Sequence, residues 1–196
     1  SEGPWKFQPA LSGVEAEWTP DDGTYKLYEN YYREIAGDNV GYRFCYDNLA
    51  EGEQITVQIG VSFVSTENAW ENLEAEQKGK DFDRVHADAV ERWNSDLGRI
   101  RVEGGTKEQQ TIFYTALYHA LIHPSTISDV NGEYPKMESA GIGKSDHTRY
   151  TVFSLWDTYR NLHQLLTLVY PERQTDMLRT MVGMYEEWGW LPRWEL

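Results

Sequence analysis

Apolar and polar residues alternate in the first third of the chain. Every second residue from Ile55 to Phe63 is apolar, and a period of two is typical of a half-buried β-strand. Aromatic-rich stretches at residues 25–35 and 42–46 predict two further strands, with a turn between them. Three strands alone would leave sheet edges and one face uncovered, so we expect an antiparallel sheet that forms part of a sandwich.

After residue 65 the apolar positions recur every three or four residues, which is typical of α-helices. The expected helices cover residues 66–76, 82–97, 106–123, 154–169 and 173–187, and Asp81 is expected to cap the second of them. Pro124 and Pro171 are expected to end the third and fourth helices. The pattern predicts a mixed architecture of three parts: residues 1–65 in an N-terminal β-sandwich domain, residues 66–105 as a helical linker, and residues 106–196 as helices of a further domain.

Core-facing side chains are expected on the last three helices. They are Ile112, Ala116 and Ala120 on the third, Leu155, Tyr159, Leu162, Leu166 and Val169 on the fourth, and Met177, Met181 and Met184 on the fifth. A brief strand is expected at residues 100–102. The irregular stretch from 125 to 149 is expected to hold a hairpin around Asn131 and Gly132, because Asn-Gly is a strong tight-turn signal.

Composition narrows the classes of function. The net charge of −14 disfavours nucleic acid, whose phosphates an acidic protein would repel. A mean hydropathy of −0.66 and the lack of a long uncharged apolar run exclude a membrane span. The single cysteine, Cys45, is expected to be a small buried hydrophobe. Eight Trp, 13 Tyr and six Phe, many beside charged residues, suit either an aromatic core or a sugar site.

Two polar patterns resemble metal sites only weakly. His119 and His123 have the i, i+4 spacing of a zinc helix, but Ala120 replaces the glutamate of such sites, so hydrogen-bonded histidines are the favoured interpretation. The run from Asp129 to Gly132 lacks the later ligands of a calcium loop, and a turn is favoured there.

A stronger pattern is the run Phe-Ser-Leu-Trp-Asp-Thr-Tyr-Arg at residues 153–160. Trp156 could stack on a sugar ring while Asp157 binds its hydroxyls, and a helix N-terminus would stabilise that carboxylate. The structural alternative makes Asp157 a helix cap with Arg160 as its ion-pair partner. Residues 188–195 repeat the mixture, with Trp194 beside Glu195. If the last two helices are antiparallel neighbours, the two motifs meet at one end and form one pocket.

With these motifs the chain resembles glycoside hydrolase family 92, the calcium-dependent α-mannosidases. The resembling segments are residues 60–69, 111–120, 150–160 and 189–196, in family order and with family-like spacing. The resemblance implies the end of an antiparallel β-sandwich, a helical linker and the first helices of an incomplete α/α toroid. It also implies inverting hydrolysis of α-linked mannosides, and many family members are specific for the α-1,2 linkage.

By this resemblance the substrate-binding residues are Asp157 and its neighbour Trp156, with Arg160, Trp194 and Glu195 as weaker candidates. The resemblance places the catalytic acid in a Glu-Gly-Asn motif and the base at a later aspartate. Neither motif occurs in this chain, so no catalytic residue is assigned. Calcium is the implied cofactor, with no ligands identifiable here. The implied substrate is a mannose-containing oligosaccharide, and the implied location is the periplasm or the cell exterior. A partner chain or oligomer is expected to complete the toroid.

Two other functions fit the same residues. The chain could be a truncated carbohydrate-binding or structural domain without catalysis, because the acid and base motifs are missing. It could also belong to another toroid glycosidase that acts on a different sugar without calcium.

Overall fold

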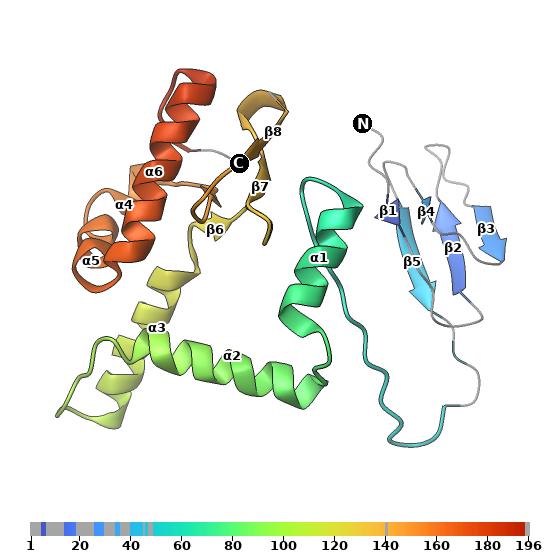
Figure 1. Ribbon diagram of the computed structural model, residues 1–196. Coiled ribbons are helices and arrows are strands. Elements are labelled where there is room, and N and C mark those ends of the chain that lie inside the picture. The colour runs from blue at the N-terminus through green and yellow to red at the C-terminus, as the bar shows by residue number, and fades with distance from the viewer. Residues whose placement is uncertain are drawn as a thin grey trace. The chain divides into compact units, whose positions relative to one another are not determined.

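The computed structural model describes five strands within the first 44 residues, residue 46, and residues 49–139 and 141–194. It divides into two compact units, which we describe separately. The first comprises Ser1–Ile59 and Ser65–Glu67, and the second comprises Gly60–Val64 and Asn68–Leu196. The element order, β-strands first and helices afterwards, agrees with the predicted order (Figure 1).

The first unit contains antiparallel strand pairs. Its strands are β1 (Trp5–Lys6), β2 (Val14–Trp18), β3 (Lys26–Glu29), β4 (Glu34–Ile35) and β5 (Val40–Phe44). β2 lies between β3 and β5, and Ala16 stands opposite both Tyr28 and Tyr42. β1 pairs with β4. The strand predicted at residues 25–35 is thus divided into β3 and β4, while Cys45 and the turn predicted at 36–39 lie outside the described residues.

The strand predicted at residues 55–64 is wrong. Over the continuous described stretch 49–64 the chain forms no strand, and Phe63 is 68% exposed whereas Ser62 beside it is half-buried. A β-strand requires a second strand to pair its backbone groups. Here the chain follows a helix instead: the Asn72 amide donates to the Val61 carbonyl at 2.9 Å, and a Cβ on Gly60 would lie 2.2 Å from the Ala69 carbonyl oxygen.

The helices account for most of the remaining chain. They are α1 (Thr66–Gln77), α2 (Phe82–Leu97), α3 (Lys107–Ile122), α4 (Leu155–Thr158), α5 (Leu162–Val169) and α6 (Pro171–Trp188). Between α3 and α4 lie a short helical turn, η1 (Met137–Ser139), and two small antiparallel pairs, β6 (Ser125–Thr126) with β9 (Tyr150–Thr151) and β7 (Glu133–Pro135) with β8 (Ile142–Lys144). Asp81 caps α2 as predicted, its carboxylate accepting from the Arg84 N–H. No helix in the described part of the chain has the length and apolar character that a membrane span requires.

The single helix predicted at residues 154–169 is interrupted. The chain leaves the helical path after Thr158, and the Gln164 side chain donates to the Tyr159 carbonyl at 3.1 Å, a group that a continuous helix would have paired internally. Pro171 ends α5, as predicted, and also occupies the first turn of α6, where a missing N–H costs nothing. α5 and α6 pack side by side (Figure 1).

The core of the second unit joins four of these elements. It consists of Leu117, Tyr150, Phe153, Leu166, Tyr170, Met177 and Met184, so the predicted methionine stripe is confirmed as core, with Met181 partly buried beside it. The predicted inner face of α3 is wrong, because Ile112 is 62% exposed and Leu117 points inward instead. Tyr159 is also exposed, and residues 100–102 form no strand.

A buried carboxylate connects α2 to α6. Asp96 accepts from Arg173 Nη2 at 2.5 Å and from Arg92 Nε at 3.2 Å, while its backbone carbonyl accepts from the Tyr170 hydroxyl at 2.9 Å. Burial alone raises the pKa of Asp96, but the hydrogen bonds and charges of Arg173 and Arg92 outweigh it, and the pKa lies below the usual aspartate value. The charged form is therefore the one that stabilises the fold.

We expect Asp96→Asn to lower the free energy of unfolding at pH 7 by about 2–3 kcal/mol, because the two guanidinium groups lose their counter-charge. The folded-state pKa is depressed, so this contribution is present above the unfolded-state value of about 3.9 and is lost as the pH falls through the folded-state value. Urea unfolding of both proteins from pH 7 down to pH 3 measures it. Asp88→Asn, which changes a half-buried ion-pair residue on the same helix, is the control and should have a much smaller effect. A difference between Asp96→Asn and the parent chain that stays constant with pH would contradict this account.

Candidate functional site

The chain enters the predicted 153–160 motif through an unusual backbone turn. Val152 has a φ of 61°, a left-handed conformation that is strained for a β-branched residue. The next side chain, Phe153, is 2% exposed and belongs to the core. Strained residues tend to persist where the surrounding packing holds them, and often at functional sites. The buried Phe153 therefore holds the turn that presents the following residues at the surface.

Asp157 lies on this exposed turn. Its Oδ2 atom accepts a hydrogen bond from the Ser154 hydroxyl at 2.6 Å, and its backbone N–H donates to the Ser154 carbonyl at 3.0 Å. Among the described residues, Oδ1 of Asp157 has no hydrogen-bond partner. The carboxylate is thus oriented through one oxygen while the other is available to a ligand, which is an arrangement suited to binding hydroxyl groups.

The structural alternative for Asp157 is wrong in both parts. The N-cap position of α4 belongs to Ser154, and Arg160 lies over the Tyr159 ring, 5.6 Å from its centroid, instead of pairing with Asp157. α4 has only four residues, so the predicted stabilisation of Asp157 by a helix dipole does not apply either. The Ser154 hydroxyl, and not Arg160, orients the Asp157 carboxylate.

The second motif meets the first, as predicted. Ser154 and Trp194 form an antiparallel β-bridge, and the Arg193 guanidinium lies over the Trp156 ring, 5.3 Å from its centroid. α6 ends at Gly189 in the left-handed conformation, and the chain then turns back toward α4. Glu195 lies outside the described residues.

We call Trp156, Asp157, Arg193 and Trp194 the aromatic cluster. Trp156 and Trp194 are 57% and 60% exposed, which is high for side chains with so large an apolar surface. Exposed indole faces can stack on the C–H patches of a sugar, while carboxylate and guanidinium groups bind hydroxyls in pairs. One face of Trp156 is covered by Arg193, so a ligand stacked on Trp156 would use its other face.

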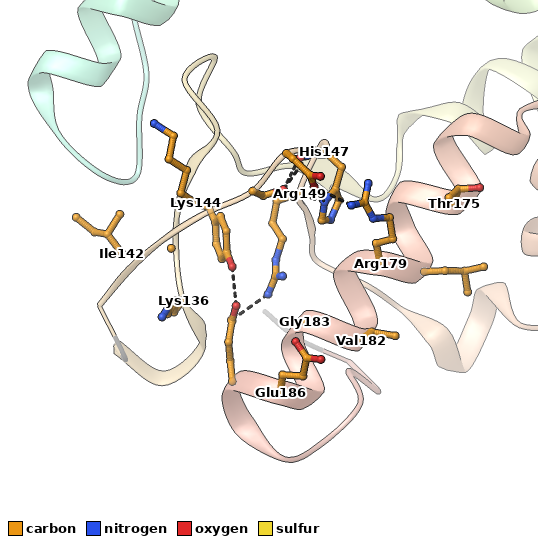
Figure 2. Close-up of a pocket in the computed structure, with 16 residues that line it drawn as sticks. Lys136, Ile142, Lys144, His147, Arg149, Thr175, Arg179, Val182, Gly183 and Glu186 are labelled. Carbon is orange, nitrogen blue, oxygen red and sulfur yellow. Dashed lines mark hydrogen bonds and ion pairs between the residues drawn. The ribbon is translucent and has the colours of Figure 1, made fainter.

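A hollow of about 1140 Å³, which the aromatic cluster does not line, lies between the β7–β8 hairpin and α6 (Figure 2). Arg149 is buried in its wall, 4.4 Å from the centroid of the Tyr134 ring, and pairs with Glu187 at 2.9 Å. The Tyr134 hydroxyl donates to the same carboxylate at 2.7 Å. Burial raises the pKa of Tyr134, and the hydrogen bond to Glu187 raises it further. A Cβ at Gly183 of α6 would lie 2.2 Å from Arg149 Nη1, so a larger residue there would displace the guanidinium. The hydrogen bond from Tyr134 to Glu187 fastens the hairpin to α6.

The two weak metal patterns have the following surroundings. His119 and His123 are exposed at the end of α3. Gly132 has a φ of 86° and its N–H donates to the Asp129 carbonyl, so the predicted turn is confirmed. The hairpin predicted around Asn131 and Gly132 is wrong, because both paired strands, β7 and β8, come after this turn. Asp129 itself accepts from Ser62, Asn68 and Asn72 at 2.7–2.8 Å. Within the described ranges, no three His, Cys, Asp or Glu side chains are grouped so that they could hold a metal ion.

Comparison with known proteins identifies the family. The sequence model of the glycosyl hydrolase family 92 catalytic domain matches residues 68–196. The chain belongs to glycosyl hydrolase family 92. Its mixed helices and small sheets occur in solved structures of that family.

Three family relatives illustrate the similarity. The family GH92 α-mannosidase BT3965 of Bacteroides thetaiotaomicron is 29% identical with a TM-score of 0.76, over 95% of this chain and 25% of that one. The inverting mannosidase BT2199 of the same organism is 27% identical with a TM-score of 0.73, over 92% of this chain and 24% of that one. An uncharacterized secreted glycosidase of Arthroderma benhamiae is 30% identical over 112 residues, which are 55% of this chain and 14% of that protein. The chain therefore spans a quarter or less of these relatives' length.

Sequence reasoning missed several residues of this candidate site. Ser154 and Arg193 contact the predicted residues directly, and Thr158 and His163 lie behind them. Ser154 had a usable signal, since a hydroxyl residue three positions before an acidic one at a helix start is a known capping pattern. The position of Arg193 over Trp156 had none, because it depends on how two distant segments pack.

We expect two aromatic residues of the same motif to differ sharply in their effect on stability. Phe153→Ala should lower the free energy of unfolding by about 3–5 kcal/mol, because it empties a buried site. Trp156→Ala should change it by about 0.5 kcal/mol or less, because the indole is exposed. Urea unfolding followed by circular dichroism measures both. Equal losses would mean that the Trp156 ring is part of the core and not a free binding face.

Proposed function

We propose that this family 92 chain is part of an α-mannosidase, and that its aromatic cluster binds the terminal mannose of an α-linked, α-1,2 mannoside of the kind found in N-glycans. The observation that carries the proposal is the meeting of the two motifs at the Ser154–Trp194 bridge. It brings two exposed indoles, an oriented carboxylate and a guanidinium together from segments far apart in the sequence. The printed names of the two bacterial relatives, both mannosidases, support the choice of sugar.

In this proposal the side chains divide the binding between them. Asp157 accepts hydrogen bonds from sugar hydroxyls through Oδ1, which has no partner among the described residues, since Ser154 already occupies Oδ2. Trp156 and Trp194 stack on the sugar or shape the wall around it. Arg160 is proposed as an outer member of the same wall, and Glu195, outside the described residues, stays a proposed substrate-binding residue.

The proposed reaction is inverting hydrolysis. One carboxylic acid protonates the leaving oxygen, and a carboxylate about 6.5–9.5 Å away activates water on the opposite face of the sugar. No described residue is assigned to either role. Calcium is proposed as the cofactor of the whole enzyme, where it would bind sugar hydroxyls. The described residues do not assemble a site for it, so no step of the binding argument depends on calcium.

We further propose that residues 1–65 belong to a β-sandwich domain, 66–105 to a helical linker and 106–196 to the opening helices of an α/α toroid. Exposed apolar side chains on α5 and α6, such as Leu168, Val182 and Tyr185, support further helices, a partner chain or an oligomer that packs against them. A periplasmic or secreted location is proposed as well, and the fungal relative is itself named a secreted glycosidase.

A second candidate is a carbohydrate-binding or structural module without catalysis. The observation in its favour is that the chain spans a quarter or less of its relatives, and that no described residue is assigned as acid or base. Both candidates use the aromatic cluster to bind sugar, and they differ in whether a glycosidic bond is broken.

We expect Asp157→Asn to lower kcat/KM for α-1,2-mannobiose by about 10- to 150-fold in the protein that carries this sequence, because a charged hydrogen bond to the sugar becomes a neutral one. The thermal midpoint should stay unchanged, since the carboxylate is exposed. Initial rates and thermal unfolding measure the two effects.

Asp83→Asn, an exposed aspartate in the first turn of α2, is the matched control and should leave both quantities at their parent values. An Asp157→Asn protein with near-parent kcat/KM would remove Asp157 from the site.

We expect the first sugar released from α-1,2-mannobiose to be β-mannose, because inversion reverses the anomeric configuration. Proton NMR during the first minutes of the reaction distinguishes the anomers before they equilibrate. The reaction is run in calcium and again after chelation, and chelation should reduce the rate. Release of α-mannose would contradict an inverting mechanism, and binding without any release by a folded sample would favour the non-catalytic module.

A further inference from the structure

The turn that carries the aromatic cluster cannot hold its own shape. α4 contains four residues, and a single helical turn fixes many backbone angles for very few hydrogen bonds. Both Trp156 and Asp157 are exposed, so their side chains add little packing. Phe153 anchors the N-terminal side of the turn, and a separate contact is needed on its C-terminal side.

That contact is a chain of hydrogen bonds through three side chains. Thr158 Oγ1, at the end of α4, lies 3.0 Å from Nε2 of His163 in α5. Nδ1 of the same imidazole lies 3.0 Å from the side-chain amide of Gln174 in α6. Gln174 is 5% exposed and sits in the rigid helix that provides much of the core. His163 therefore connects α4 to the buried part of the unit.

The protons determine the direction of the contact. A threonine hydroxyl has one proton, and Thr158 donates it to the Ser154 carbonyl at 3.0 Å. The lone pairs of Thr158 remain, so His163 Nε2 must carry a proton and donate it to Thr158. The amide of Gln174 can face Nδ1 with either its oxygen or its nitrogen and so pairs with the ring in either state.

The chain of contacts ends on the candidate ligand-binding carboxylate. Ser154 accepts from Thr158 through its carbonyl and donates to Asp157 Oδ2 through its hydroxyl at 2.6 Å. The same residue forms the β-bridge to Trp194. Ser154 is thus the point at which support from α5 and α6 reaches both halves of the aromatic cluster.

We propose that His163 is a positioning residue for sugar binding, and that it acts by donating an Nε2–H hydrogen bond to Thr158 that fixes the Ser154–Asp157 pair. The proposal rests on the function proposed for Asp157. Its distinguishing content is which ring nitrogen matters: Nε2 serves the site, whereas Nδ1 serves only the packing of α5 on α6.

Two amide substitutions separate the two nitrogens. A glutamine amide can reach the position of Nε2, and an asparagine amide reaches only that of Nδ1. We expect His163→Gln to retain kcat/KM for α-1,2-mannobiose within about twofold of the parent, because the bond to Thr158 is kept. His163→Asn should lower kcat/KM by about 3- to 10-fold, chiefly through KM, because one neutral hydrogen bond that orients the binding turn is lost.

Thr158→Val removes the acceptor and should reproduce the His163→Asn defect, and the double variant should be no worse than either single variant. Thermal unfolding of every variant accompanies the kinetics, and Asp157→Asn is measured in the same assay. An effect of Asp157→Asn together with parent-like kinetics in His163→Asn would overturn the positioning role alone. The positioning role would also be overturned if His163→Gln lowered kcat/KM and His163→Asn did not. Equal losses of kcat/KM in both variants, in proportion to a lowered thermal midpoint, would overturn it as well. If Asp157→Asn has the same kcat/KM as the parent, the proposed function is overturned and this inference with it.

Discussion

The reversal of the chain at Tyr170 and Pro171 is the constraint on which the candidate site depends. Tyr170 is fully buried, its hydroxyl donates to the Asp96 carbonyl, and the Arg99 and Arg173 guanidinium groups lie over its ring. Pro171 begins α6 at the next residue. With α5 and α6 fixed against each other in this way, the residues before α4 and those after α6 are brought to one place. The Ser154–Trp194 bridge is the consequence.

Buried polar contacts connect the remaining elements to α6. Arg173 and Asp96 join it to α2, Tyr134 and Glu187 join it to the β7–β8 hairpin, and Gln174 joins it to α5 through His163. Removing one partner of such a contact leaves the other buried and unpaired, which is expensive in free energy. The positions of these elements around α6 are therefore specific as well as stable, and a binding site needs that specificity more than it needs additional stability.

The candidate site itself combines rigid and exposed parts. Phe153 and Gln174 are buried, whereas Trp156, Asp157 and Trp194 lie at the surface. Ser154 and Thr158 transmit the position of the buried residues to the exposed ones by hydrogen bonds shorter than or equal to 3.0 Å. This arrangement presents polar and aromatic groups to a ligand without requiring the ligand to order them, which reduces the entropic cost of binding.

Much of this could be predicted from local sequence. The methionine stripe, the Asp81 cap, the Asn-Gly turn and the two aromatic motifs each depend on a few neighbouring residues, whose periodicity and turn chemistry are local properties. The four ordered motifs were also sufficient to suggest family 92, to which the chain belongs.

The errors arose where contacts with residues distant in the sequence decide the local structure. Residues 55–64 alternate like a strand but have no strand beside them in the described chain, and the Asn72 amide of α1 donates to the Val61 carbonyl instead. Packing between segments far apart in sequence decides which helix face is buried. It also decides that Arg160 lies over Tyr159 and that Ser154 links Asp157 to Trp194. The sequence by itself determined which segments tend to be helix, strand or turn, because those tendencies depend on neighbours along the chain; only the tertiary structure decided which side chains meet, because that depends on burial and hydrogen bonding across the fold.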